Sequence, residues 1–485
     1  MIRTCLAFLM LCGMCGDICA IPDKAEASEN VVPSKKHKKV PGSPNLVSSK
    51  GKEVSTFEEA ITAACENNKG WFASQTDKKI ADESLGQSKM AFLPDVRGSL
   101  SLERDRMDRR EKTGSIEKDN KSATKSTNTV MGLTITQNLF NGGATWNRMK
   151  GNESASAAAY HKLKFEEQRL IIRVLDAYTS TWMNGQKVIA LKKKEENLKK
   201  TADSQQASLD AGAGTPTEVA QAIANCQRAR YERISAETDL FAAKSEVERL
   251  TCRKASENIE LPELKSGLPD DLDKLIALAM ANNQSILSTH QDARAAISNL
   301  KATRGALAPS CDLSLQTRKS LNRNWSRPED YLDLQQQGKN RSNNYNASLS
   351  ITIPIFSNNP QSGNTYSAIA IASQQAQKAQ FTAEDTRLEV KKECIVNWNK
   401  YVAATAMIKA SKAAVESAEV ASRGGSAEND MGVKSNTDIL VQENQLLDAR
   451  IGLAEAKRQR VLAAMQILML SGVLDLQFVL RQSKV

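Results

Sequence analysis

The stretch Asn344 to Phe356, NYNASLSITIPIF, determines the fold that the sequence predicts. Apolar and aromatic side chains alternate in it with polar residues and one proline, and this period of two is typical of a β-strand. The apolar series is Tyr345, Ala347, Leu349, Ile351, Ile353 and Ile355. The pattern occurs four times, each time beside helix-like sequence. We therefore interpret the apolar faces as contacting lipid rather than the core of a soluble domain.

The composition favours long helices over large globular cores. The chain has 485 residues, only 5% aromatic residues and a mean hydropathy of -0.44. No run of 18 apolar residues occurs, so we expect no transmembrane helix in the mature chain. Residues 1–20, with Arg3 before the apolar run 5–15 and Ala20 at the end, predict a cleaved secretory signal. Cys15 and Cys19 lack a good lipidation motif, so we expect an exported, unlipidated chain.

The charge and the cysteines carry little functional information. The formal charge of +10 is spread along helices and interleaved with acidic residues, which disfavours nucleic-acid binding. Five cysteines remain after cleavage, widely scattered and without metal-ligand spacing: Cys65, Cys226, Cys252, Cys311 and Cys394. We interpret them as small buried side chains, with a disulfide as the alternative.

Nothing in the sequence predicts an enzyme. The three histidines are His37 in the basic N-terminal segment and His161 and His290 in helical stretches. No nucleotide-binding loop, nucleophile elbow or zinc cluster is present, so we expect neither a cofactor nor a metal.

The first half of the chain has a clear order of elements. A disordered basic segment, 21–54, precedes a first structural repeat at 55–252. This repeat is predicted to contain a helix at 57–91, a β-hairpin at 95–139 with a polar solvent loop at 105–128, a long helix at 146–211 and a helix at 217–250. A linker, 253–271, follows.

The second half repeats the first. Residues 57–68 match 272–283 at a shift of 215, and Thr217 to Val219 match Thr437 to Ile439 at a shift of 220. The second repeat, 272–472, is predicted to contain a helix at 272–307, a hairpin at 311–356 with a loop at 320–344, a long helix at 361–428 and a helix at 437–470. A C-terminal tail, 473–485, remains. The small drift of the shift indicates tandem duplication.

The predicted helix lengths fit together. In the first repeat the two short helices contain 35 and 34 residues, and together they are about as long as the long helix of 66 residues. In the second repeat the short helices contain 36 and 34 residues and the long helix contains 68. Two short helices stacked end to end would run along each long one. The result is an antiparallel helical cylinder of ~100 Å with strands at one end and tight turns at the other.

The strands cannot form a closed barrel within one chain. Four strands in lipid leave two edges of unpaired backbone groups, and the smallest membrane barrels have about eight strands. Two or more copies must therefore share a barrel. The predicted lipid-facing residues are Leu100, Leu102, Leu133, Ile135, Leu313, Leu315, Leu349, Ile351 and Ile353. The predicted water-facing residues are Ser99, Ser101, Thr134, Thr136, Ser314, Gln316, Ser348 and Thr352.

Two further groups of residues lie at element boundaries. Thr215, Pro216 and Glu218 form a predicted helix start with a capping box. Phe140, Trp146 and Phe356 stand where strand changes to helix, and could form an interfacial aromatic belt or simply pack at the junction.

The layout resembles the TolC family of outer-membrane efflux and secretion ducts over residues 55–472. The similar segments are AFLPDVRGSLSL, TITQNLFNGG, ALAPSCDLSL and SLSITIPIF, with the turns GAGTPTEV and GVKSNTDI. The resemblance implies an α+β membrane protein: a homotrimer with one twelve-stranded β-barrel, four strands per chain, continued by a long α-helical barrel. It places the chain in the cell outer membrane, spanning into the periplasm, with the linker and tail at an equatorial region.

The resemblance also implies partners and site residues. The partners are a periplasmic adaptor protein and an inner-membrane ABC or proton-driven transporter. The periplasmic aperture matches Glu218, Lys434 and Asp438, and the adaptor-facing turns match Gly212, Gly214, Thr215, Gly432 and Ser435. The chain departs from the family at Val441, where some members have a second acidic ring, and at Asn429, which replaces a tyrosine. Helix capping alone is an equally good interpretation of Glu218 and Asp438.

The predicted function is a passive conduit of a tripartite export system, for type I protein secretion, multidrug efflux or both. The missing lipidation cysteine favours the protein-secreting branch by analogy. The alternatives are a component for drug efflux only and a periplasmic coiled-coil scaffold that forms no channel.

Overall fold

The computed structural model describes most of the chain after the basic N-terminal segment. The described residues are 53–112, 119–256, 259–262, 267–327, 336–355, 358–359, 363–430 and 436–482. The predicted signal peptide and nearly all of segment 21–54 lie outside them. All described residues belong to the unit Lys52–Val485.

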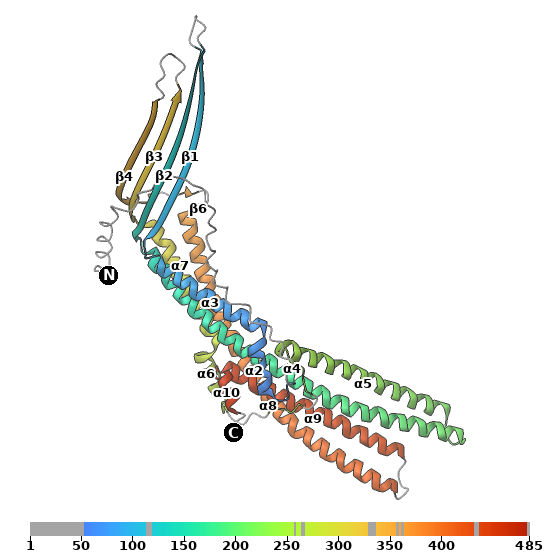
Figure 1. Ribbon diagram of the computed structural model, residues 1–485. Helices are drawn as coiled ribbons and strands as arrows, with labels where there is room; N and C mark the ends of the chain where they lie inside the picture. The colour runs from blue at the N-terminus through green and yellow to red at the C-terminus, as the bar shows by residue number, and fades with distance from the viewer. Residues whose placement is uncertain are drawn as a thin grey trace. The chain divides into compact units, whose positions relative to one another are not determined.

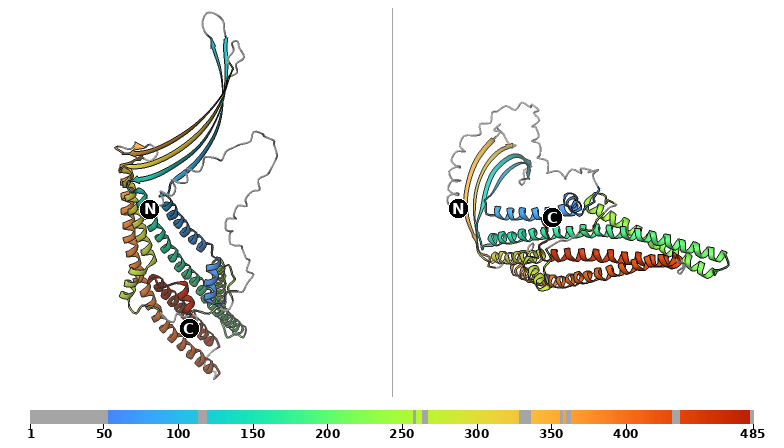
Figure 2. Two further views of the ribbon diagram at one scale, coloured as in Figure 1. Left: turned by 60° about the vertical axis from the view of Figure 1, so that its left-hand side comes forward. Right: turned by 90° about the horizontal axis from the view of Figure 1, so that it is seen from below.

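Four long strands form one antiparallel sheet (Figure 1). They are β1 (Asp95–Lys112), β2 (Asp119–Asn141), β3 (Ser310–Arg327) and β4 (Gln336–Thr352). The order is β1-β2-β3-β4, so β2 of the first repeat pairs with β3 of the second. Figure 2 shows that the four strands curve in the same direction.

The strands are longer than the sequence predicted. The solvent loops predicted at 105–128 and 320–344 were wrong for most of their length, because pairing continues at Asp105 with Ser126 and at Asn322 with Asn340. Backbone hydrogen bonds hold an antiparallel ladder whatever the polarity of its side chains, so polar sequence did not end the strands.

The helices follow the predicted order with different boundaries. Those of the first repeat are α2 (Phe57–Asn67), α3 (Lys69–Met90), α4 (Ala144–Asp210) and α5 (Pro216–Thr251). Those of the second are α6 (Leu272–Asn282), α7 (Gln284–Arg304), α8 (Thr365–Asp430) and α9 (Asn436–Leu470). Four short elements among the described residues were not predicted: the 3-10 helix η2 (Gly305–Leu307), β5 (Asn358–Asn359), β6 (Gly363–Asn364) and α10 (Leu476–Gln482) in the tail.

The single helices predicted at 57–91 and 272–307 were wrong, because an asparagine breaks each of them. Asn68 and Asn283 have extended backbone angles and cap the helix that follows. The Asn68 side chain accepts a hydrogen bond from the Trp71 backbone N–H at 3.0 Å, and Asn283 accepts one from Ser285 at 3.0 Å. The helical pattern continues across each break, so periodicity alone did not reveal it.

The same two asparagines join the short helices end to end, as predicted from their lengths. Asn68 Nδ2 donates to the carbonyl of Leu250 at 3.3 Å, which links the start of α3 to the last turn of α5. Asn283 Nδ2 donates to the carbonyl of Leu470 at 3.1 Å, which links α7 to α9. The long helix α4 contacts both stacked pairs, whereas α8 contacts α6, α7 and α9 (Figure 2).

The largest buried cluster lies where these helix ends meet. It includes Ile61, Leu175, Tyr178 and Leu250, and Val479 of α10 packs into it. The Tyr178 hydroxyl donates to the backbone carbonyl of Ser55 at 2.8 Å. Among the helices that the structure describes, none is both long and apolar enough to cross a membrane.

Candidate functional site

The register of the sheet places the predicted lipid-facing residues on one face. Leu100 pairs with Met131, Ile135 pairs with both Val96 and Leu315, and Leu313 pairs with Leu349. Directly paired residues point to the same side of a sheet, so the remaining predicted residues in the strands, Leu102, Leu133 and Ile351, share this side. Ile353 follows β4 directly and is exposed. We call this side the apolar face.

The opposite side of the sheet is polar. Thr136 pairs with Ser314, which pairs with Ser348, and Thr134 pairs with Gln316. Asn138 Nδ2 donates to the Asp312 carboxylate at 2.7 Å. The register places the other predicted water-facing residues on this side too: Ser99, Ser101 and Thr352. A curved sheet with one apolar and one polar side is suited to separate lipid from water.

Aromatic residues mark the base of the apolar face. Phe140 pairs with Cys311 after a β-bulge and is 53% exposed, and Trp146 in the first turn of α4 is 54% exposed. Lys150 Nζ lies 5.6 Å from the centre of the Trp146 ring. Phe356, the third residue of the predicted belt, lies outside the described residues. Both described side chains are thus exposed in the single chain rather than packed at the junction, and the aromatic belt stays a prediction.

The turn between α4 and α5 has the capping geometry that the sequence predicts. Gly212 has a φ of 75°, which favours glycine, and a side chain at Gly214 would approach the Leu209 backbone at 3.0 Å. The Thr215 hydroxyl accepts from the Glu218 backbone N–H at 3.3 Å, and the Glu218 carboxylate accepts from the Thr215 N–H at 3.0 Å. Glu218 therefore caps α5, while the exposed turn leaves room for a second role.

The turn between α8 and α9 is only partly described. Gly432, Lys434 and Ser435 lie outside the described residues. Asp438 is exposed in the first turn of α9, where a carboxylate interacts favourably with the helix dipole. Val441, one turn further, is also exposed.

Polar contacts between α4 and α9, which sequence reasoning missed, connect the two repeats. Lys194 Nζ lies 3.2 Å from the Asp448 carboxylate, and Asn197 Nδ2 donates to Glu443 at 2.8 Å. Nearer the sheet, the Arg458 guanidinium donates to Asp176 at 2.6 Å and to Ser180 at 2.8 Å. We call these four contacts the α4–α9 ladder. Their partners lie 246 to 282 residues apart, so no local pattern could indicate them.

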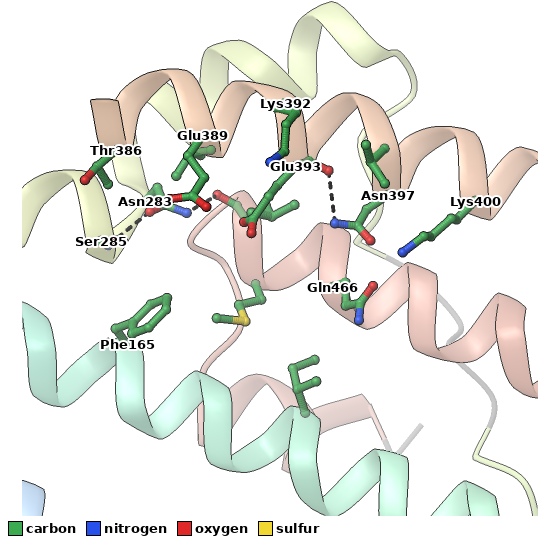
Figure 3. Close-up of a pocket in the computed structure, with 15 residues that line it drawn as sticks. Phe165, Asn283, Ser285, Thr386, Glu389, Lys392, Glu393, Asn397, Lys400 and Gln466 are labelled. Carbon is green, nitrogen blue, oxygen red and sulfur yellow. Dashed lines mark hydrogen bonds between the residues drawn. The ribbon is translucent and has the colours of Figure 1, made fainter. Parts of the chain in front are cut away.

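A cavity of about 490 Å³ lies among α4, α7, α8 and α9 (Figure 3). Glu389 and Glu393 of α8 line it together with Phe165 of α4. Loss of solvent raises the pKa of Glu393, and the neighbouring Glu389 adds to this effect. No cluster of three or more potential metal ligands occurs in the part of the chain that the structure describes. The cavity has no evident nucleophile and base pair, and we assign it no chemistry.

Comparisons with known proteins agree with this geometry. The family model "Outer membrane efflux protein" matches residues 60–252 and 275–473, one match for each repeat. The chain is 25% identical to the outer membrane efflux protein BepC of Brucella suis, covering 86% of this chain and 85% of BepC. It is 22% identical to the alkaline protease secretion protein AprF of Pseudomonas aeruginosa, covering 71% and 70% of the two chains.

A solved structure has the same fold. The Campylobacter jejuni CmeC outer membrane channel superposes with a TM-score of 0.68 at 17% identity, covering 90% of this chain and 94% of CmeC. Because the family model covers both repeats, the chain belongs to the outer membrane efflux protein family of TolC-like outer-membrane export channels, and it is a transport protein rather than an enzyme.

Proposed function

We propose that three copies of this chain close one twelve-stranded barrel and form the exit duct of a tripartite export system. TolC-family channels are trimeric and belong to tripartite systems. The observation that carries the proposal for this chain is its open sheet. Among the described strands, β1 and β4 each pair on one side only, so two edges of 18 and 17 residues have backbone groups without a strand partner in this part of the chain. Unpaired groups in lipid cost several kcal/mol each, so β4 of one copy should pair with β1 of the next.

The helices support the same head-to-tail arrangement. On α5, Tyr231 and Phe241 are 74% and 73% exposed, and on α8, Phe381 is 72% exposed. The stacked helices α3 and α5 lie on one side of α4. The stacked helices α7 and α9 lie on its other side, between α4 and α8. Contact between α8 of one copy and α3 and α5 of the next would cover these apolar side chains and close a ring.

Reconstitution tests this proposal directly. The purified mature protein should partition into detergent, run as a trimer by native mass spectrometry and produce stepwise conductance in planar bilayers. A monodisperse monomer that stays soluble without amphiphile, or a bilayer without conductance, would contradict the proposal and favour the periplasmic scaffold.

We propose that Glu218, Asp438 and Lys434 contribute to the aperture at the helical end. Three copies of each carboxylate near the axis would attract cations and bind multivalent blockers. Asp438→Ala should therefore reduce cation selectivity and weaken block by multivalent cations in planar bilayers.

Glu218 offers a matched pair that separates gating from capping. Glu218→Gln retains the capping box but removes the charge, whereas Glu218→Ala removes both. If the aperture role is correct, both variants change cation block. If only the alanine variant has an effect, and that effect is on stability, Glu218 is a cap alone.

The proposed cargo is protein, handed over from an inner-membrane ABC transporter through an adaptor that contacts the α4–α5 and α8–α9 turns. The adaptor-facing residues would be Gly212, Gly214, Thr215, Gly432 and Ser435. The name of AprF refers to protease secretion, which supports this branch. The name of BepC refers to efflux, so drug export with a proton-driven transporter is the second candidate. Deleting the gene should remove secreted proteins from the medium; if only drug sensitivity changes, the second candidate is correct.

A further inference from the structure

Basic residues gather on the apolar face just beyond its apolar part. On β3, Lys319 pairs with Met131, which pairs with Leu100, so it shares their face. Farther from the helices, up to the level of Arg104, the same register adds four more cationic residues from three strands. The five residues, which we call the basic girdle, are Arg104, Lys319, Arg323, Lys339 and Arg341.

Charges of opposite sign are separated across the sheet at this level. On the face of the girdle, the described positions from Leu100 to Arg106 and their register partners include no carboxylate. Glu103 and Asp105 lie on the polar face instead, where Asp105 accepts a hydrogen bond from Ser126 at 3.4 Å. The next carboxylate on the girdle's face is Asp108, which pairs with Arg106 at 3.1 Å. Among the side chains that the structure describes on this face, the girdle therefore has no acidic partner.

The girdle is unfavourable without an anion. Arg323 pairs directly with Lys339 in the register, and like charges directly opposite each other destabilise a sheet. None of the five side chains forms an ion pair with another described residue, and all except the half-buried Lys319 are exposed. Arg323 lies on β3 directly opposite Lys339 of the neighbouring strand β4, and Arg341 lies two residues from Lys339 on β4. They could surround one anionic group.

The position of the girdle indicates which anion it meets. The apolar series of β4 begins nearest the helices at Ile353, just after the strand, and ends at Tyr345. Arg341 lies beyond Tyr345, farther from the helices. Eight residue steps span ~27 Å along a strand, or about 20 Å across a membrane at the usual tilt of about 40°. This height is close to the apolar band of about 25 Å in membrane barrels. The girdle then lies at the headgroup level of the leaflet farther from the helices.

We propose that the basic girdle binds the phosphate of an anionic lipid headgroup in that leaflet. The inference rests on the proposed barrel, because only there does the apolar face contact lipid. Guanidinium groups bind phosphate oxygens in pairs of parallel hydrogen bonds, and lysine adds a point charge. The bound phosphate would relieve the repulsion between Arg323 and Lys339 and hold the lipid against the barrel.

The test uses the full-length assembled protein in neutral detergent micelles. Phosphatidic acid is added to one sample, diacylglycerol with the same acyl chains to a second and inorganic phosphate to a third, and bound lipid is counted by native mass spectrometry. Arg323→Gln should weaken phosphatidic acid binding about fivefold, because one cationic residue near a membrane surface contributes ~1 kcal/mol to the binding of anionic lipid. A combined variant should weaken phosphatidic acid binding at least about a hundredfold. It replaces four residues by glutamine: Arg104, Arg323, Lys339 and Arg341.

Arg318→Gln is the matched control. Arg318 lies on the same strand but on the polar face, since it pairs with Gly132 and Asn344, and its loss should change binding less than twofold. Each of three results would overturn the proposal. Arg318→Gln could weaken phosphatidic acid binding as much as Arg323→Gln, diacylglycerol could bind as tightly as phosphatidic acid, or inorganic phosphate could displace the lipid at matched concentration. Conductance is measured in parallel. A wild-type protein without conductance contradicts the proposed function, whereas a conducting combined variant with unchanged lipid binding contradicts only the girdle.

Discussion

The long helices α4 and α8 occupy equivalent places in the two repeats but are not equally buried. At the shift of 220 that relates Thr217 to Thr437, Val174 corresponds to Cys394, and both are buried. One residue later, Leu175 is 0% exposed, whereas its counterpart Ile395 is 39% exposed. One stripe of each helix is thus buried in both repeats, and a second stripe is buried only on α4.

The neighbours of each helix explain this difference. The first repeat's α4 has α3 and α5 on one side and α7 and α9 on the other, whereas α8 contacts α6, α7 and α9. Helix α8 is therefore at one edge of the helical layer, as β4 is at one edge of the sheet. The comparison teaches that two helices with similar sequence patterns can be buried differently, and in the proposed trimer a neighbouring copy would cover the exposed stripe of α8.

The largest expected effect is on the fully buried stripe. Leu175→Ala should lower the free energy of unfolding by about 2–5 kcal/mol, because it leaves a cavity in the main cluster. Ile395→Ala should change the unfolding of the single chain by about 1 kcal/mol or less and instead weaken the trimer. Urea unfolding and native electrophoresis in detergent measure the two effects. A trimer that is unchanged in Ile395→Ala would contradict the assignment of α8 to the interface.

A smaller effect is expected at the two asparagine breaks, where the repeats should behave alike. Asn68→Ala and Asn283→Ala each remove a helix cap and a hydrogen bond to the stacked helix, so each should destabilise by about 1–3 kcal/mol. Replacement by aspartate retains the cap acceptor but not the donor, and should cost less. Thermal unfolding of the four variants checks this, and a large difference between the repeats would refute their equivalence.

The α4–α9 ladder tests whether the repeats are joined by specific contacts. Arg458→Gln should destabilise by about 1–2 kcal/mol, because the guanidinium is largely covered and binds both Asp176 and Ser180. The control is Arg249→Gln, which breaks an exposed pair with Glu246 within α5 and should cost about 0.5 kcal/mol or less. Equal costs for the two variants, measured by urea unfolding, would mean that the ladder adds nothing specific.

The smallest effect concerns the reactivity of one covered thiol in each repeat. Burial raises the pKa of Cys65 in α2 and of Cys394 in α8 to about 11 in each case. At pH 8 only about one thiol in a thousand is then ionised, so both should react slowly with a thiol reagent. Cys252 is exposed and should react first.

The pH dependence has a definite sign. The raised pKa values favour the folded state below pH 9, and this stabilisation is lost as the pH rises from 9 towards 11, because the unfolded thiols ionise first. Labelling should accelerate over the same range. Mass spectrometry of labelled peptides measures it, and fast labelling of Cys394 at pH 8 would show that the α8 core is open.

Much of the site could be predicted where the pattern is local. The alternation around Leu349 and Ile351 predicted the apolar face, and Thr215 with Glu218 predicted the capping box. All five described cysteines are free, and the interpretation of them as small buried side chains was wrong for Cys252, which is exposed. The ends of the strands could not be predicted, because residues such as Asp105 and Asn322 have no apolar pattern and are paired through their backbone.

The sequence by itself determined the duplication, the two-sided strands, the long helices and the family. Each of these depends on residues close together in the chain, or on a repeated order of such patterns. The tertiary structure alone decided the breaks at Asn68 and Asn283, the α4–α9 ladder, and which stripe of each long helix is buried. These features depend on partners more than 180 residues away, such as Leu250 and Leu470, and on whether a helix lies inside the layer or at its edge. Periodicity records which side of a helix is apolar, but packing decides what covers it.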